Sequence, residues 1–491
     1  RRHVTRAAML RVRGPSSRGV AGTAYGAGGG GRLAVDNPYT GEVYCEVPLA
    51  APEEATEQVA RAAAAGREWA ATTTVQQRIE ACDRFIEEFE KIREQVAMDV
   101  TGQMGKPLAY ARGEVDGMYE RTRGMMGLAQ AALADDVLPE KKGFVRRIVR
   151  EPVGVVLVVA PWNYPLLTAA NTIIPAILAG NAVIVKHSSR TPLCAEAFAR
   201  AFAAAGVPTD LVTALHCSHG VVEDVIADPE VGFVAFTGSV GGGHSIYQTV
   251  ARSRFIDTTL ELGGKDPAYV AVDADLDAAV STLVDGAFFN AGQSCCGIER
   301  VYVARPLYDD FVERALAAVN AYQLGDPVDS RTTMGPLAQA DAPAFLHAQV
   351  KDAVARGAAL LCGGEPVTDA AGKGRFFAPA LLADCNHEMD IMMEESFGPV
   401  LGVMPVDGDD DAVKLMNDSP YGLTAVAFTA DDERAEALSR RVSCGTFFQN
   451  RCDYLDPELA WTGVRDTGKG VSLSVHGFRG VTKLKSLHFK R

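Results

Sequence analysis

The feature that most restricts the fold is an alternation of apolar strands with helices that begins after Phe144. The segment VVLVVA (155–160) is uniformly apolar, which is typical of a central parallel strand covered on both faces. Helices predicted near 166–178, 192–205 and 220–227 alternate with the apolar runs NAVIVKHS, LVTALHC and GFVAFTG. This order predicts a doubly wound α/β sheet, whose parallel strands end along one edge where ligands bind.

The remaining chain predicts a second unit of the same class. At 491 residues the chain is too long for one compact domain. A second strand–helix alternation begins near Gly263, whereas helical patterns at 53–69 and 76–100 follow a predicted hairpin at 33–48. The tail GVTKLKSLHFKR has the pattern of a terminal strand. We therefore expect an α/β protein with two doubly wound parallel-sheet domains.

Charge is distributed unevenly along the chain. Residues 1–35 hold seven arginines and no acid, and subtracting them from the formal net charge of −14 leaves −21 for the rest. The strongly negative net charge of residues 36–491 argues against a nucleic-acid partner. The Arg-, Ala- and Ser-rich start resembles an organelle transit peptide, with a disordered tail as the alternative. The sequence thus predicts a mitochondrial or plastid location, and otherwise a cytoplasmic one.

Two bulk features exclude further classes. The run from Pro152 to Val185 has no charge and is long enough to span a bilayer, but its prolines and asparagines divide it into short pieces, so we expect no membrane span. The ten cysteines show no paired spacing, which favours a reducing compartment over a disulfide framework.

The segment FFNAGQSCCGIERV places two cysteines, Cys295 and Cys296, side by side after a Gly-Gln turn. A thiol there is a candidate nucleophile if its thiolate forms, although a single cysteine is more often a small buried hydrophobe. Metal binding needs further ligands at set spacing. The other His/Cys cluster, HCSH at 216–219, is a weak candidate, and we expect no metal site.

Two polar residues lie at predicted strand ends. Glu261, in TLELGGKDP, has an apolar setting that would raise the pKa of its carboxyl and suit a general base; the alternative is a surface glutamate. Asn163, in APWNYP, offers a neutral amide donor for a developing oxyanion, or simply forms a turn.

Two segments could hold a dinucleotide. AVIVKHSSRTP ends a strand with Lys186 and serines suited to ribose or phosphate. AFTGSVGGGHS places Gly238 and Ser239 at a strand-to-helix turn, where amide donors can meet a pyrophosphate. No G-x-G-x-x-G follows the first strand, so the ordinary Rossmann fingerprint is absent.

Taken together, the ordered motifs PWN, K, FTGS, ELGGK, GQSC, EESFGPV and NDSPYGL resemble those of the aldehyde dehydrogenase superfamily from residue 37 to the tail. The resemblance implies that Cys295 attacks an aldehyde and that Asn163 and the Cys295 N–H stabilise the oxyanion. Hydride then passes to NAD or NADP, and Glu261 activates water to hydrolyse the thioester. The cofactor-binding residues that it implies are Trp162, Lys186, Ser189, Gly238, Ser239, Glu395 and Phe397.

The resemblance also implies a division of the chain. A dinucleotide-binding domain would comprise 36–135 and 152–262, a catalytic domain 263–450, and oligomerisation strands 136–151 and 472–491. A homodimer or homotetramer is then expected.

Several points stay open at this level. Ser189 stands where many NAD-preferring members carry an acid, so NADP is admissible. A CoA-acylating enzyme and a non-catalytic structural member of the fold are the alternatives. Tyr164, Asn171, Phe288 and Phe289 are expected to line the aldehyde tunnel, but they do not identify the aldehyde.

Overall fold

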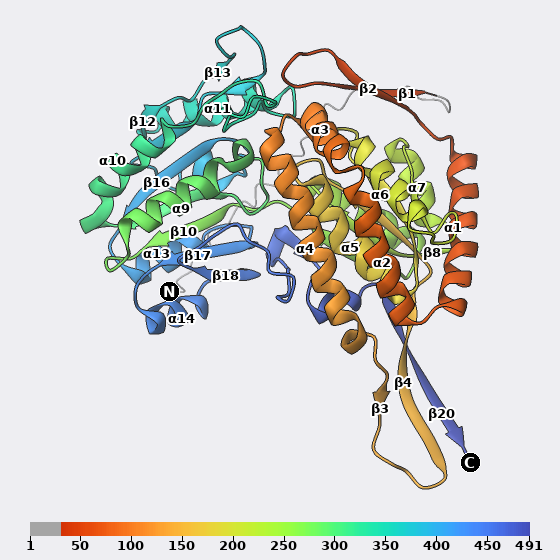
Figure 1. Cartoon of the computed structure of the whole chain (residues 1–491). Coiled ribbons are helices and arrows are strands. Elements are labelled where there is room, and N and C mark those ends of the chain that lie inside the picture. The colour runs from red at the N-terminus through yellow and green to blue at the C-terminus, as the bar shows by residue number, and fades with distance from the viewer. Residues whose placement is uncertain (1–30) are drawn as a thin grey trace, which may run out of the picture.

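A six-stranded sheet forms the first half of the computed structural model, which describes residues 31–491 (Figure 1). Its order is β19-β9-β8-β5-β6-β7, and all neighbours are parallel except β19 and β9. Chain order reverses between β5 and β8, which makes their carboxyl ends the switch point where ligands bind in such sheets. The strands are β5 (Val155–Ala160), β6 (Ala182–His187), β7 (Val212–Ala214), β8 (Val231–Thr237), β9 (Asp257–Glu261) and β19 (Gly468–Lys469).

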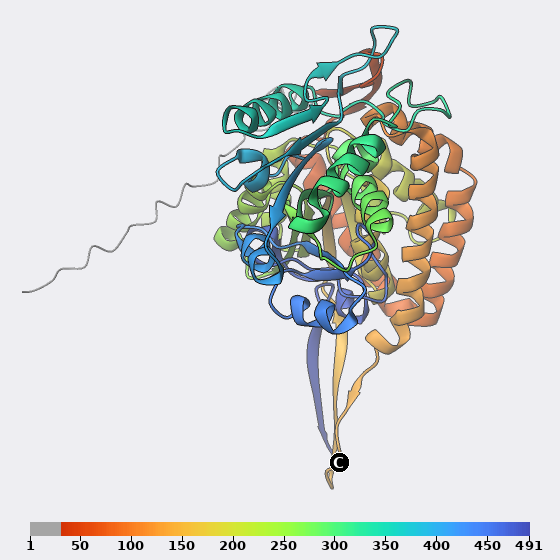
Figure 2. The same cartoon turned by 90° about the vertical axis from the view of Figure 1, so that its left-hand side faces the viewer.

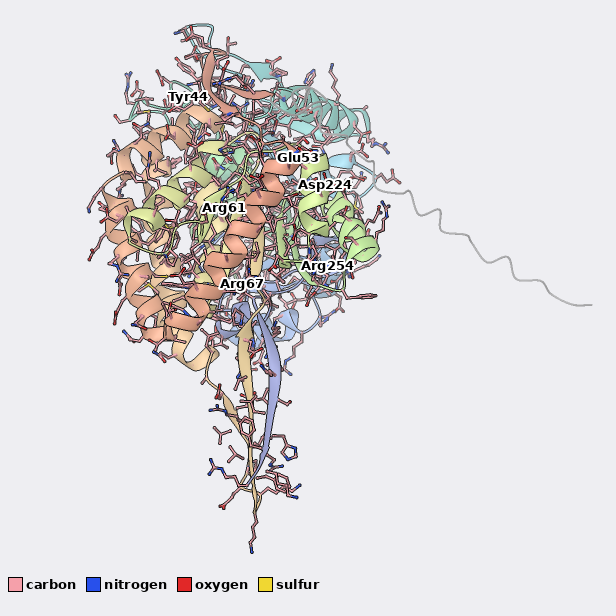
Figure 3. All side chains as sticks on the ribbon, turned by 90° about the vertical axis from the view of Figure 1, so that its right-hand side faces the viewer. Tyr44, Glu53, Arg61, Arg67, Asp224 and Arg254 are labelled. Atoms are coloured by element: carbon pink, nitrogen blue, oxygen red, sulfur yellow. The ribbon has the colours of Figure 1, made fainter. Side chains whose placement is uncertain are left out.

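Within residues 31–491, eight helices surround this sheet. Helix α1 runs along the outer side of the molecule, with Glu53, Arg61 and Arg67 along its length (Figure 3). One predicted helix, 76–100, is in fact two, because Ile92 leaves helical geometry (φ −111°, ψ 4°) and its N–H bonds to Phe89. The helices are α1 (Pro52–Thr72), α2 (Val75–Glu90), α3 (Arg93–Met104), α4 (Leu108–Ala132), α5 (Pro165–Ala179), α6 (Pro192–Ala204), α7 (His219–Ala227) and α8 (Val240–Ser253).

A seven-stranded sheet with its own apolar core forms the second half, in the order β12-β15-β16-β11-β10-β17-β18. Only its edge strand β12 is antiparallel, so the prediction of a second parallel α/β unit is confirmed. The strands are β10 (Asp266–Val270), β11 (Ile298–Ala304), β12 (Ala359–Cys362), β15 (Ala380–Ala383), β16 (Val400–Val406), β17 (Thr424–Phe428) and β18 (Thr446–Gln449). The helices are α9 (Leu276–Phe288), α10 (Tyr308–Val319), α11 (Ala342–Ala355), α12 (Asp390–Met393), α13 (Asp409–Asn417) and α14 (Asp432–Ser439); a small pair, β13 (Pro366–Val367) and β14 (Phe376–Phe377), lies beside them.

Three antiparallel strands extend away from the two sheets (Figures 1 and 2). They are β3 (Asp136–Val137), β4 (Phe144–Pro152) and β20 (Thr482–Lys490), in the order β20-β4-β3. The predicted terminal strand element began at 472, but β20 begins ten residues later. The intervening residues belong to the body, since Phe478 and Val481 are buried in the first core.

The chain start also differs from the prediction of a separate segment over 1–35. Residues 1–30 lie outside the described part, and β1 (Arg32–Asp36) already pairs with β2 (Val43–Pro48) in the predicted hairpin. Leu33 is buried there with Val35 and Val47, so residues 32–35 belong to the folded body and not to a separate segment. Within residues 31–491, no helix is both long and apolar enough to cross a membrane.

Candidate active site

The loop that carries Cys295 follows α9 through a left-handed turn, η1 (Phe289–Gly292). Asn290, Ala291 and Gly292 have φ of 54°, 55° and 68° in succession. Such a conformation costs about 1–3 kcal/mol for each residue other than glycine, and strain of this kind is concentrated at functional sites. At Gly292 a Cβ would lie 2.2 Å from the carbonyl oxygen of Gly398, so only glycine fits.

The two adjacent cysteines have different surroundings. Cys295 is partly exposed, whereas Cys296 is buried and its Sγ donates to Asp453 Oδ1 at 2.9 Å. A hydrogen bond with Cys295, burial and the charge of Asp453 raise the pKa of Cys296 well above its usual range. Cys296 therefore remains a thiol, and Cys295 is the sulfur that a ligand can reach.

Asn163 lies in the turn after β5, at the switch point of the first sheet, and is buried (4% exposed). The backbone carbonyl oxygen of Asn163 accepts hydrogen bonds from Lys106 Nζ at 2.9 Å and from Asn290 Nδ2 at 3.2 Å. Asn290 Nδ2 also reaches the carbonyl oxygen of Gln293 at 3.2 Å. Asn290 thus joins the turn that carries Asn163 to the loop that carries Cys295.

A buried ion pair packs against the turn that carries Asn163. Lys106 Nζ contacts Glu114 Oε2, and both side chains are almost fully enclosed. The other oxygen of Glu114 accepts from the N–H groups of Leu166 at 2.8 Å and Leu167 at 3.3 Å, in the first turn of α5. A carboxylate is stabilised at that position by the helix dipole. Lys106 and Glu114 therefore fix both sides of the turn that carries Asn163.

Glu261 is the last residue of β9 and is partly exposed. Its carboxylate accepts hydrogen bonds from the hydroxyls of Ser472 and Thr237. Burial raises the pKa of Glu261, and these two bonds together with the charge of Arg121 oppose the rise. A carboxyl with a raised pKa is suited to general-base chemistry near neutral pH.

The glycine pair after Glu261 allows a close approach by Glu395. Gly264 N–H donates to Glu395 Oε1 at 3.0 Å, and a Cβ at Gly263 would lie 2.5 Å from both oxygens of that carboxylate. A second buried pair, Lys265 and Glu299 at 2.5 Å, holds the same loop. Glu299 accepts from the N–H groups of Ser396 and Phe397, both at 2.8 Å.

The predicted cofactor residues gather at strand ends of the first sheet and on this loop. The Trp162 and Phe397 rings meet edge to face, with centroids 5.5 Å apart. Lys186, at the end of β6, is 5% exposed and forms no salt bridge within residues 31–491, and burial lowers its pKa. Ser239 caps α8, accepting from Gly242 N–H at 3.2 Å. A buried cation without an acid partner and a glycine-rich helix N-terminus, both at carboxyl ends of strands of this sheet, fit a phosphate-bearing dinucleotide.

Ser189 and its neighbour Arg190 differ in exposure and in their contacts. Ser189 is partly exposed beyond β6, whereas Arg190 Nη1 pairs with Asp36 Oδ1 at 2.5 Å. Arg375 contacts the other oxygen of Asp36 at 2.7 Å. The guanidinium of Arg190 is therefore paired with the carboxylate of Asp36 in the hairpin and does not offer a free positive charge to a cofactor phosphate.

The HCSH segment at 216–219 ends at the first residue of α7. His216 Nε2 contacts Glu196 Oε1 at 3.0 Å, and the described residues contain no group of three or more potential ligands arranged around a metal position.

Sequence reasoning missed the residues that support the site through contacts between segments far apart in the chain. They are Lys106, Glu114, Arg121, Asn290, Glu299, Asp453 and Ser472. One pattern could have revealed two of them: Glu114 and Arg121 occupy buried positions of the apolar stripe of α4, where a charge is costly without a partner.

Two doubly wound sheets, with a cysteine loop set against dinucleotide-type strand ends, define the class of α/β oxidoreductases that bind a nicotinamide dinucleotide. The sequence profile of the Aldehyde dehydrogenase family matches residues 26–487. The chain belongs to the aldehyde dehydrogenase family, whose members oxidise aldehydes with NAD or NADP, so the activity predicted from the motifs is confirmed at that level.

Individual relatives are similar over most of their length. The "Succinate-semialdehyde dehydrogenase [NADP(+)] 1" of Mycobacterium ulcerans is 35% identical over 93% of this chain and 99% of its own. The "Succinate semialdehyde dehydrogenase [NAD(P)+] Sad" of Escherichia coli is 34% identical over 92% and 96%. A solved structure of succinic semialdehyde dehydrogenase from Streptococcus pyogenes, in complex with NADP+, superposes with a TM-score of 0.89 at 30% identity over 94% and 100%.

These relatives correct the predicted location. The mitochondrial or plastid assignment made from the Arg-rich start is wrong, because the similar proteins come from bacteria, which have neither organelle. Arginine richness in a short segment also has other causes, and residues 1–30 lie outside the described part of the chain.

Proposed function

We propose that the chain oxidises an aldehyde to the carboxylic acid through covalent chemistry at Cys295. The observation that carries the proposal is the bridge made by Asn290, whose amide bonds both the Asn163 turn and the cysteine loop at 3.2 Å. This link between the two loops supports a site in which the Cys295 thiol and the Asn163 amide act on one carbonyl group, as nucleophilic addition requires.

In the first step, Cys295 adds to the aldehyde carbon as a thiolate. The negative charge that develops on the carbonyl oxygen is stabilised by the Asn163 side chain and the N–H of Cys295. A neutral amide suits this role because it donates a hydrogen bond to the oxyanion and neither gives up nor takes a proton. NAD or NADP held at this site would supply the hydride acceptor, and loss of hydride from the adduct would leave a thioester on Cys295.

In the second step, Glu261 takes a proton from the water that attacks the thioester. The raised pKa of Glu261 supports this role, since a base of intermediate strength combines adequate basicity with a large ionised fraction. The alternative, acyl transfer to CoA, needs no base for water. The hydrogen bonds that orient the Glu261 carboxylate favour hydrolysis.

We assign the cofactor to the carboxyl edge of the first sheet. Lys186 and Ser189 would contact the adenosine side, and Gly238 with Ser239 the pyrophosphate. Trp162, Glu395 and Phe397 would hold the nicotinamide side. Trp162 belongs to the proposed dinucleotide-binding domain (36–135 and 152–262), whereas Glu395 and Phe397 belong to the proposed catalytic domain (263–450). The contact of Glu395 with the Gly263–Gly264 backbone supports this arrangement.

We further infer a semialdehyde as the substrate. The two bacterial relatives at 34% and 35% identity are both named for succinate semialdehyde, an aldehyde that also carries a carboxylate.

We also infer a homodimer or homotetramer built on β3, β4 and β20. These strands project from the body, and Val137, Leu484 and Phe489 on them are 81%, 69% and 53% exposed. Apolar side chains exposed together in this way are typical of a subunit interface.

A kinetic screen tests the enzymatic proposal. Formation of NADH or NADPH would be followed with a panel of aldehydes, with and without CoA, and the acid or acyl-CoA product identified. We expect acid formation that CoA does not accelerate. CoA-dependent turnover would establish the acylating alternative, and absence of turnover with every aldehyde would leave a structural role.

A further inference from the structure

Arg121 is a buried guanidinium with unused donors. It lies on α4, is 9% exposed, and forms no salt bridge within the described residues. Its Nη1 donates to the carbonyl oxygen of Leu167 and to Asn171 Oδ1, both at 3.0 Å, while Nε and Nη2 donate to no atom of residues 31–491. Burial lowers the pKa of Arg121, as expected where the charge has lost water.

Two other buried arginines show what a purely structural guanidinium does in this fold. Arg78 donates through Nε, Nη1 and Nη2 to carbonyls and a hydroxyl around it. Arg300 likewise uses all three nitrogens, to four carbonyls and the Tyr302 hydroxyl. Of these three arginines, only Arg121 has guanidinium nitrogens, Nε and Nη2, without a hydrogen-bond partner in residues 31–491.

Asn171 adds an independent observation. Asn171 is 2% exposed, and its Oδ1 accepts a hydrogen bond from Arg121. Its Nδ2 is buried and has no hydrogen-bond partner among the described residues. A buried donor left unpaired costs about 1–3 kcal/mol, so such groups call for an explanation. Here the unpaired donors of Asn171 and Arg121 are neighbours, and a group that offers only acceptors would satisfy both.

The pair lies beside the reactive groups. Arg121 Nη1 bonds the carbonyl oxygen of Leu167 in the first turn of α5, four residues after Asn163. The charges of Glu261, Cys296, Glu114 and Cys295 in turn act on Arg121. Asn171 is seven residues after Tyr164 in the same helix, two turns and about 10 Å along α5 from the Asn163 turn. A substrate whose carbonyl carbon reaches Cys295 could therefore place its far end at Arg121.

We propose that Arg121 and Asn171 form the site that binds a carboxylate carried at the far end of the aldehyde substrate. This inference rests on the proposed function, and it deepens the semialdehyde assignment by naming the residues that recognise the anion. A carboxylate fits better than a phosphate: the free edge of one guanidinium matches its two oxygens, whereas a dianion would be only half neutralised. Arg121 is thus a specificity-determining residue.

The test compares anionic and neutral substrates in matched variants of the full chain. Wild type, Arg121→Met, Arg121→Lys and Arg123→Met would be assayed with the semialdehydes of four-, five- and six-carbon dicarboxylic acids, and with the corresponding ω-amide aldehydes. The readout is the ratio of kcat/KM for the acid to that for the amide. Arg123 is the matched control, since it is an exposed cation of the same helix.

We expect the wild-type ratio to exceed about 10 and to fall about 10- to 100-fold in Arg121→Met, mainly through KM, because a hydrogen bond to a charged group is worth about 1.5–3 kcal/mol. Arg121→Lys should restore part of the ratio, and Arg123→Met should keep it. An unchanged ratio in Arg121→Met would overturn the inference and leave the aldehyde oxidation intact. If no aldehyde is turned over by the wild type, the proposed function itself fails.

A binding measurement covers the case in which Arg121→Met does not fold. Asn171→Leu removes the second donor without touching the guanidinium, and it should lower the same ratio. Protection of the wild type against thermal unfolding by glutarate, absent in Asn171→Leu, would support the site without any turnover. Equal protection of both proteins would count against it.

Discussion

Ser472 donates a hydrogen bond to the carboxylate of Glu261, although 211 residues separate the two in the chain. Ser472 is held in place by paired backbone hydrogen bonds with Trp461, both at 2.9 Å. Burial raises the pKa of Glu261, and this hydroxyl is the first of the groups that oppose the rise. The contact therefore sets how basic the carboxylate is.

We expect Ser472→Ala to move the acidic limb of the kcat–pH profile to higher pH. Glu261 acts as a base only when ionised, and loss of a bond that lowers its pKa makes the raised pKa rise further. At pH values above the limb, turnover should return to near the wild-type value. The pH dependence of kcat is the measurement, with Ser472→Thr as the control that keeps the hydroxyl. A limb that stays in place in Ser472→Ala would show that Glu261 does not limit turnover.

Much of the fold could be predicted because its strands are uniformly apolar and its helices periodic. The buried strands β5 and β6 and the helix between them were predictable from one uncharged run. The strand ends placed Asn163 and Glu261 where the structure has them. Boundaries were less certain, as the break at Ile92 and the late start of β20 show.

The supporting contacts of the site could not be predicted, because they join residues far apart in the chain. Lys106 and Asn163 are 57 residues apart, and Asn290 is 127 residues from the carbonyl it bonds. Nothing local in the sequence marks such pairs, since each depends on how distant segments pack together. A charge in an apolar helical stripe, as at Arg121, is the only local indication.

Replacing Cys295 with serine should lower turnover at least about 10³-fold, as loss of a nucleophile does in other enzymes that form a covalent intermediate. No acyl-enzyme should be detectable by mass spectrometry after exposure to aldehyde and cofactor. Cys296→Ser is the matched control: its hydroxyl can still donate to Asp453, so it should keep most of the activity. Greater loss in Cys296→Ser than in Cys295→Ser would reverse the assignment.

Glu261→Gln should separate the two halves of the reaction. Thioester formation does not need this carboxylate, so a burst of about one NAD(P)H per active site is expected on rapid mixing. Steady-state turnover should then fall about 10²- to 10⁴-fold, the usual contribution of a general base. Stopped-flow absorbance at the nicotinamide band measures both phases, and Glu261→Asp tests whether a shorter carboxylate restores part of the second. Loss of the burst would assign Glu261 an earlier role.

Breaking the buried pair below the Asn163 turn should destabilise the protein. In Lys106→Met, the Glu114 carboxylate would stay buried without its cation, which costs about 3–5 kcal/mol. We expect a Tm several degrees lower in calorimetry, with a parallel loss of activity as Asn163 loses its support. The double variant Lys106→Met/Glu114→Gln, which removes both charges, should recover part of the stability. Equal Tm values for wild type and Lys106→Met would show that the pair is not an energetic unit.

A carboxylate at position 189 should shift the cofactor preference towards NAD. By its place three residues after Lys186, Ser189 is expected near the adenosine ribose, and Arg190 cannot compensate because its charge is committed to Asp36. In Ser189→Asp, repulsion of the 2′-phosphate should lower kcat/KM for NADP about 10- to 100-fold, since like charges placed close together cost several kcal/mol. Ser189→Asn has nearly the same shape without the charge, so it separates repulsion from crowding. The ratio of kcat/KM for NADP to that for NAD, measured for all three proteins, should change only in Ser189→Asp. The same change in Ser189→Asn would mean that size, not charge, governs the choice at this strand end.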